Sequence, residues 1–140
     1  MTKKFSMMVF ALLATGSALA QHTVTLTVKG VGSTKGKVSA ALYTDQRTWL
    51  KFDQVFMATS EAAEQGTTVL TFTDVPQGNY AIAVFHDQNG NGKLDTNMLG
   101  IPKEPVAFSK AKMKMFGPPS FEEASFMVDG DVALTIRLND

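Results

Sequence analysis

Residues 80–86 read YAIAVFH, a nearly continuous apolar run that ends at a polar stretch beginning with Asp87. The turn sequence Pro76-Gln77-Gly78 stands just before the run. An uninterrupted apolar run of this length is typical of a strand covered on both faces, because a half-exposed strand alternates apolar with polar residues. We therefore expect residues 80–86 to form a central strand of a β-sheet.

The segments on either side of this run alternate apolar and polar residues with a period of two, as half-buried strands do. The expected strands are residues 23–29, 37–42, 67–74 and 131–138, with weaker patterns at 55–60 and 124–128. Asp129-Gly130 predicts a two-residue hairpin turn between the last two strands. Asp45 predicts the cap of a short helical turn that reaches Leu50. About seven short strands separated by turns predict an all-β fold, a single antiparallel β-sandwich.

Residues 1–20 are expected to be a signal peptide that is cleaved after Ala20. Two lysines precede an apolar run over residues 7–15, and the small residues Ala18 and Ala20 follow it. The run is shorter than the roughly 20 residues that a membrane-spanning helix needs, which favours cleavage over an uncleaved anchor. The expected product is one β-sandwich domain, residues 21–140, in the periplasm or outside the cell.

The composition of residues 21–140 excludes several classes of function. The segment carries 11 basic and 13 acidic residues, so its net charge is near −2 and gives no reason to expect a nucleic-acid partner. The chain has no cysteine, which excludes disulfides, thiolate metal sites and a cysteine nucleophile. No segment after the signal peptide is apolar enough to predict a transmembrane helix.

A long loop rich in proline and glycine, residues 87–123, interrupts the pattern of strands. It carries four prolines but also many large apolar side chains, which disordered segments lack. We expect an ordered excursion over one end or edge of the sandwich. Phe108, Phe116 and Phe121 are candidates for a recognition surface, or they cover the end of the sandwich. Three lysines of this loop alternate with apolar residues: Lys110, Lys112 and Lys114. In an extended segment they would lie on one side and could bind an anionic lipid or glycan surface. We prefer the alternative that they form a solvated strand edge, because edge strands commonly carry lysines.

The loop opens with a pattern that suits a hard cation such as Ca²⁺. Oxygen-bearing side chains alternate in the order Asp87, Asn89, Asn91 and then Asp95, and the Lys93 carbonyl falls where calcium loops use a backbone ligand. Methionine stands where such loops place a bidentate glutamate, so a further carboxylate is needed. Glu104 is one candidate, and the others are Glu122, Glu123 and Asp131. The alternative is a plain turn, because Asp, Asn and Gly also form Asx turns.

His86 beside Asp87, with Ser109 later in the chain, raises the possibility of a hydrolase triad. The sequence has no nucleophile-elbow pattern around a serine, and a histidine at a strand end is more often structural. We therefore name no catalytic residue. A metal-dependent hydrolase that uses residues 86–104, with His86 or Glu104 as the base, remains an alternative.

Residues 86–104, HDQNGNGKLDTNMLGIPKE, together with Phe108-Ser109 and FGPPSF at residues 116–121, resemble the bacterial exported family catalogued as domain-of-unknown-function family 2141. The family has no established activity, so the resemblance assigns no catalytic residue. PQGNYAIAV, residues 76–84, is also similar to a segment of transthyretin-like and other immunoglobulin-like sandwiches. That similarity implies an immunoglobulin-like (transthyretin-like) fold.

The sequence therefore predicts an exported, non-catalytic binding or envelope-associated module in which Ca²⁺ stabilises the loop. Residues 100–104 and 116–121 are the expected recognition surface, for an envelope component, a glycan or a protein. A purely structural domain without metal is the remaining alternative. An enzyme is disfavoured because oxygen-ligand calcium sites activate water less than zinc and the sequence has no histidine cluster.

Overall fold

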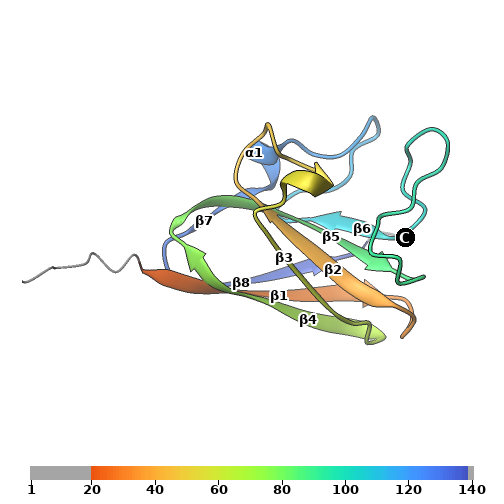
Figure 1. The fold of residues 1–140 in the computed structure, drawn as a ribbon, viewed down its shortest axis with the longest axis horizontal. Helices are drawn as coiled ribbons and strands as arrows, with labels where there is room; N and C mark the ends of the chain where they lie inside the picture. The colour runs from red at the N-terminus through yellow and green to blue at the C-terminus, as the bar shows by residue number, and fades with distance from the viewer. Residues whose placement is uncertain (1–19, 139–140) are drawn as a thin grey trace, which may run out of the picture.

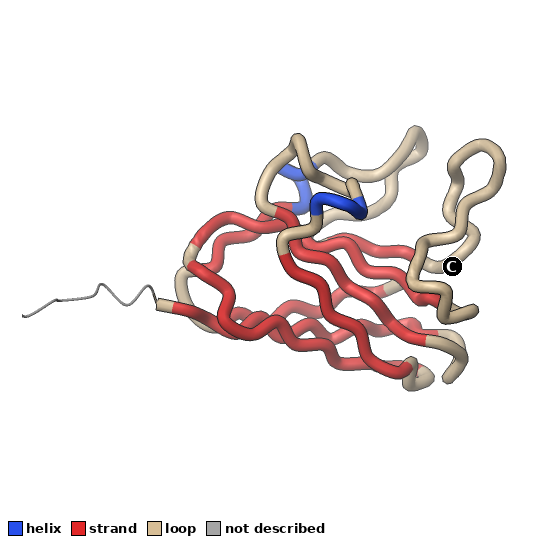
Figure 2. The backbone as a smooth tube through the Cα atoms, in the orientation of Figure 1, coloured by secondary structure: helices blue, strands red, loops and turns tan. Residues whose placement is uncertain are grey.

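The structure is a computed structural model in which residues 20–138 are described (Figure 1). The expected signal peptide lies outside the described residues except for Ala20. Eight strands in the described part form two sheets that lie face to face, and loops rise from the outer side of the larger sheet (Figure 2). Within residues 20–138, no helix has the length and apolar character needed to cross a membrane.

The smaller sheet has three strands, with β1 in the middle. β1 (Gln21–Val31) pairs with β4 (Gly66–Pro76) antiparallel and with β8 (Val132–Arg137) parallel. The parallel register sets Val132, Leu134 and Ile136 opposite Val24, Leu26 and Val28, so two apolar alternations face the interior together.

The larger sheet has five strands, with β5 (Gly78–Asp87) at its centre. β2 (Lys37–Tyr43) pairs with one edge of β5, and β3 (Met57–Ala62) lies beyond β2. The other edge of β5 is shared by β6 (Val106–Phe108) and β7 (Ser125–Val128).

The structure confirms that residues 80–86 form a central strand covered on both faces. Tyr80, Ile82 and Val84 point into the core between the sheets. On the opposite face, Ala81 is fully buried and belongs to a second apolar cluster. The members of that cluster are Tyr43, Trp49, Ala81, Phe108, Phe121 and Ala124.

Two expectations about strand pairing are wrong. The sandwich is not wholly antiparallel, because β8 runs parallel to β1. Asp129-Gly130 does not close a hairpin, because β7 pairs in the larger sheet and β8 in the smaller one. The connection from β7 to β8 therefore crosses from the larger sheet to the smaller one. β8 pairs with β1, whereas β7 pairs with β5.

Smaller differences concern β3 and the segment before it. The strand expected at residues 55–60 is found at Met57–Ala62. Asp45 does cap a turn, since its Oδ1 accepts a hydrogen bond of 2.9 Å from the Thr48 amide, and a short 3-10 helix, η1 (Phe52–Gln54), follows. The Thr48 amide is the main reason why the pKa of Asp45 lies below its usual value.

Gly36→Ala is predicted to destabilise the protein more than Gly66→Ala does. Both glycines have a positive φ, which costs an alanine about 1–2 kcal/mol. At Gly36 the added Cβ would also overlap the Asp87 carbonyl oxygen, whereas nothing lies within 4 Å of a Cβ at Gly66. Urea unfolding of both variants checks this, and equal losses of free energy would contradict the close approach of Gly36 to the end of β5.

Candidate functional site

Three segments without long regular structure cover the outer face of the five-stranded sheet. They are residues 44–56, which include η1, residues 88–105, called here the first loop, and residues 109–120, called here the second loop. Figure 1 shows all three on the same side of the molecule, above β2, β5 and β6. They bring together parts of the chain that are far apart in the sequence.

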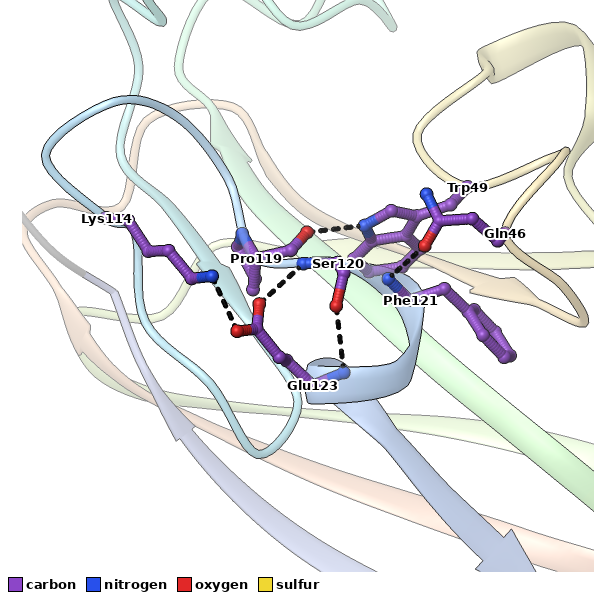
Figure 3. Close-up of polar contacts among 7 residues, drawn as sticks. All are labelled: Gln46, Trp49, Lys114, Pro119, Ser120, Phe121 and Glu123. Carbon is purple, nitrogen blue, oxygen red and sulfur yellow. Dashed lines mark hydrogen bonds and ion pairs between the residues drawn. The ribbon is translucent and has the colours of Figure 1, made fainter.

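Trp49 fixes residues 44–56 against the end of the second loop. Its ring lies 5.2 Å from Tyr43, 5.9 Å from Phe108 and 6.1 Å from Phe121, measured between ring centroids. Its indole Nε1 donates a hydrogen bond of 2.8 Å to the Pro119 carbonyl (Figure 3). A buried tryptophan needs such a partner, and here the partner belongs to the other segment.

A short helix, α1 (Phe121–Ala124), is held by a capping box at the end of the second loop. Ser120 Oγ accepts from the Glu123 amide at 3.2 Å, and Glu123 Oε2 accepts from the Ser120 amide at 2.8 Å. Lys114 Nζ lies 2.5 Å from Glu123 Oε1, so the side of the loop is tied to the same carboxylate (Figure 3). The bonds from Lys114 and Ser120 hold the pKa of Glu123 below its usual value.

An apolar cleft of about 600 Å³ lies between the two loops, above the sheet. Its floor includes Ala41 of β2 and Ala83 of β5, which are directly opposite each other, and Phe108 of β6, opposite Ala83 on the other side. These two small residues leave space above the strands between the larger side chains of Tyr43 and Phe85, which lie two residues further along β2 and β5. The walls are Leu99 and Ile101 of the first loop, Met115 and Phe116 of the second, and Leu50 and Phe52 of residues 44–56.

Few polar groups reach this cleft. Thr96, Lys114 and the hydroxyl of Tyr43 are the polar side-chain groups among its lining residues. Burial raises the pKa of Tyr43 to about 12, still further above ordinary pH, at which this hydroxyl is neutral. The lysine is paired with Glu123. The cleft therefore suits a largely apolar ligand.

The predicted calcium ligands lie together at the start of the first loop, where they form a hydrogen-bonded network. Asn89 Nδ2 donates to Asp95 Oδ2 at 2.6 Å, and Asn91 Nδ2 donates to Asp95 Oδ1 at 2.9 Å. These amide groups hold the pKa of Asp95 below its usual value. The oxygens of Asn89 and Asn91 accept from the amides of Asn91 and Lys93, as Asx turns do.

Asp87 and Glu104 complete this network from the two ends of the first loop. Asp87 is 1% exposed; its Oδ2 accepts from the Gly92 amide at 2.8 Å, and its Oδ1 is buried without a hydrogen-bond partner. Glu104 accepts from the amides of Gln88 at 2.7 Å and Asp95 at 3.1 Å. Of the four further carboxylates considered from the sequence, Glu104 is the one bonded to this loop, whereas Glu123 bonds Lys114 and Asp131 bonds the Thr23 amide.

In the part of the chain that the structure describes, no three His, Cys, Asp or Glu side chains form a group that could hold a metal ion. The residues brought together at the first loop are two asparagines and three carboxylates, two of which, Asp95 and Glu104, have both oxygens hydrogen-bonded. Binding of a cation there requires the two amides to turn their oxygens towards Asp95.

His86 and Ser109 contact different backbone groups. His86 is fully buried, and its Nε2 donates to the Lys35 carbonyl at 2.7 Å. Ser109 Oγ accepts from the Ile82 amide at 2.9 Å and donates to the Ala124 carbonyl at 2.5 Å. Both side chains therefore join elements of the fold rather than face a cleft.

The three candidate recognition residues have different positions. Phe108 lies in the floor of the cleft and Phe121 is packed under Trp49, whereas Phe116 is 98% exposed at the tip of the second loop. The sequence interpretation missed Ala41, Ala83 and the contribution of Leu50 and Phe52. The available signal was the small size of two residues on the same face of neighbouring expected strands.

The fold and the site define a two-sheet, all-β protein with an apolar cleft between two loops. The chain belongs to the bacterial family described as "Uncharacterized protein conserved in bacteria (DUF2141)", whose model matches residues 26–135. The match spans both sheets and both loops. No curated protein and no solved structure matches the chain.

Replacement of Glu123 by glutamine is predicted to lower the midpoint of thermal unfolding near pH 7 and to lower it by less at acidic pH. Because folding lowers the pKa of Glu123, its contribution is present above the unfolded value of about 4.3 and is lost as pH falls through the folded value. The difference in midpoint between the wild type and Glu123→Gln should shrink from about pH 7 to about pH 3. Glu122→Gln is the matched control, since its side chain makes neither bond, and a Glu123→Gln difference that does not change with pH would contradict this role.

Proposed function

We propose that this protein is an exported, non-catalytic binding module that holds an apolar ligand in the cleft between its two loops. The observation that carries the proposal is the cleft itself, with its apolar lining and its volume of about 600 Å³. Binding sites for small ligands are commonly clefts of roughly 300–1,000 Å³ with mostly apolar walls and few polar groups. An envelope component with an apolar portion is the class of ligand that fits.

The positions of the titratable groups favour binding over catalysis. His86 faces the core and bonds Lys35, and Glu104 accepts backbone amides with both oxygens. Neither residue lines the cleft, whose titratable side chains are Tyr43 and Lys114. A hydrolase that used the first loop would have to free one of these two groups from its bonds before it acted as a base.

We further propose that Ca²⁺ organises the first loop through Asp87, Asn89, Asn91, the Lys93 carbonyl and Asp95, with Glu104 as the additional carboxylate. The buried, unpartnered Oδ1 of Asp87 supports this proposal, because a buried carboxylate oxygen without a donor is costly and a cation would satisfy it. The position of Glu104 also supports it. Such an ion would join both ends of the loop that forms one wall of the cleft.

Export and the finer classification of the fold are part of the same proposal. Residues 1–20 support export through their signal-peptide pattern.

An immunoglobulin-like (transthyretin-like) sandwich is supported by Tyr80, whose hydroxyl donates to the Pro76 carbonyl at 2.7 Å. A tyrosine that bonds the backbone a few residues upstream at a corner between sheets is a feature of such sandwiches.

Filling the floor of the cleft is predicted to weaken the binding of an apolar probe. N-phenyl-1-naphthylamine, which fluoresces in apolar surroundings, should bind the wild type, and Ala83→Phe should weaken its binding by about tenfold or more. Fluorescence titration of both proteins measures this. Ala133→Phe, at an exposed position of β8, is the control and should bind as the wild type does. No fluorescence change with the wild type, or equal affinity in Ala83→Phe, would overturn the cleft as a binding site.

Calcium is predicted to raise the unfolding midpoint of the wild type but not that of Asp87→Asn/Asp95→Asn. A ligand of the folded state adds about 1.4 kcal/mol of stability for each tenfold rise in its concentration above the dissociation constant. Thermal unfolding in EDTA and in a CaCl₂ series measures the effect.

The matched control for calcium is Asp53→Asn/Asp129→Asn, which removes the same charge from two exposed positions outside the loop. It should respond to calcium as the wild type does. Identical midpoints of the wild type in EDTA and in calcium would overturn the cation proposal and leave the Asx network as a purely structural turn.

A further inference from the structure

The exposed charges of the two loops are all of one sign. Between residues 88 and 120 every fully exposed ionisable side chain is a lysine, whereas Asp95 is half-buried and Glu104 is buried. Asp95 is bonded by two asparagines, and Glu104 is buried against backbone amides. The exposed lysines are Lys93, Lys103, Lys110, Lys112 and Lys114.

This clustering is local, because the remainder of residues 21–140 is acidic. Outside residues 88–120 that segment contains six basic and eleven acidic residues. A chain with little net charge therefore has its positive groups gathered on the loops. A partner with negative charge would be drawn to the lysines of the two loops.

The tips of the same loops carry large apolar side chains in full contact with solvent. Met98 is 103% and Leu99 83% exposed in the first loop, and Met115 is 90% and Phe116 98% exposed in the second. Leu99, Met115 and Phe116 line the same cleft, so the two tips lie on one side of the protein (Figure 1). Apolar groups exposed to this extent lower their free energy by leaving water.

Apolar tips surrounded by lysines match the surface of an anionic bilayer. The apolar side chains enter the boundary between headgroups and acyl chains, while the lysines remain at the level of the negatively charged headgroups. A soluble protein partner would also bury the apolar tips, but Lys93, Lys103, Lys110 and Lys112, which form no ion pair with a described residue, favour a surface with many negative charges.

We propose that the tips of the first and second loops dock this protein on membranes that contain anionic lipid. Met98 and its neighbours insert into the interface, and Lys103, Lys110 and Lys112 bind the headgroups. This goes beyond ligand binding in the cleft, although the docked loops would present the cleft to the lipid layer.

The test is co-sedimentation of a chain that begins at Gln21 with lipid vesicles. Such a chain keeps all the described strands and lacks the apolar run of residues 7–15, which could itself enter a bilayer. Binding to equimolar phosphatidylcholine and phosphatidylglycerol vesicles is expected, with little binding to phosphatidylcholine alone and release at high salt. Met98→Trp should show a blue shift of tryptophan emission on the anionic vesicles.

Two variants separate membrane docking from the cleft, because their residues do not line it. Lys103→Gln/Lys110→Gln/Lys112→Gln should weaken vesicle binding about a hundredfold, and Met98→Ser should weaken it several-fold, while both still bind N-phenyl-1-naphthylamine. Matched controls on the outer face of the three-stranded sheet are Lys29→Gln/Arg137→Gln and Val69→Ser, which should bind vesicles as the wild type does.

Absence of binding to either kind of vesicle would overturn the proposal, and so would equal binding to both kinds that the lysine changes leave unaltered. Loss of vesicle binding in the control variants would also overturn it, since the docking face would then lie elsewhere. If the wild type binds the vesicles but does not bind N-phenyl-1-naphthylamine, the proposed ligand binding in the cleft is overturned and the membrane docking is not.

Discussion

β5 must be covered on both faces, because its residues are apolar on both sides, and the arrangement of the molecule follows from this requirement. The inner face is covered by the three-stranded sheet. The outer face is covered by loops, in which Trp49 and Phe121 bury Ala81. That cover is incomplete at Ala83, where two opposed, partly buried alanines leave the sheet open to the cleft. The cleft is thus the part of the outer face that the loops surround without filling.

The loops hold their shape through specific hydrogen bonds rather than through regular secondary structure. The indole of Trp49, the capping box at Ser120 and the Asx network of the first loop each satisfy backbone groups that strands or helices would otherwise pair. The walls of the cleft are therefore defined, while three of their side chains, Leu99, Met115 and Phe116, remain exposed to solvent. A defined wall with an exposed apolar tip is an arrangement suited to binding.

The proposed activities use neighbouring parts of the same two loops, and the cleft and the tips share Leu99, Met115 and Phe116. The cation is assigned to the base of the first loop at Asp87, the apolar ligand to the space between the loops, and the bilayer to their tips. Charge is separated in the same way, because the carboxylates point inward to backbone and amide donors whereas the lysines point outward. The near neutrality of the whole chain conceals this separation.

Local patterns in the sequence were enough to predict the all-β class, the central strand at residues 80–86 and the gathering of Asp87, Asn89, Asn91 and Asp95, because each depends on neighbours within a few residues. The single loop expected at residues 87–123 is divided by β6, whose three residues pair with β5 and carry no strand pattern long enough to recognise in the sequence. The parallel pairing of β8 with β1 was decided by tertiary structure, since strands that adjoin in sequence can still find better apolar partners in the other sheet. The same holds for the cleft and for the approach of Glu104. Their residues come from separate segments, and only packing across the sheet brings them together.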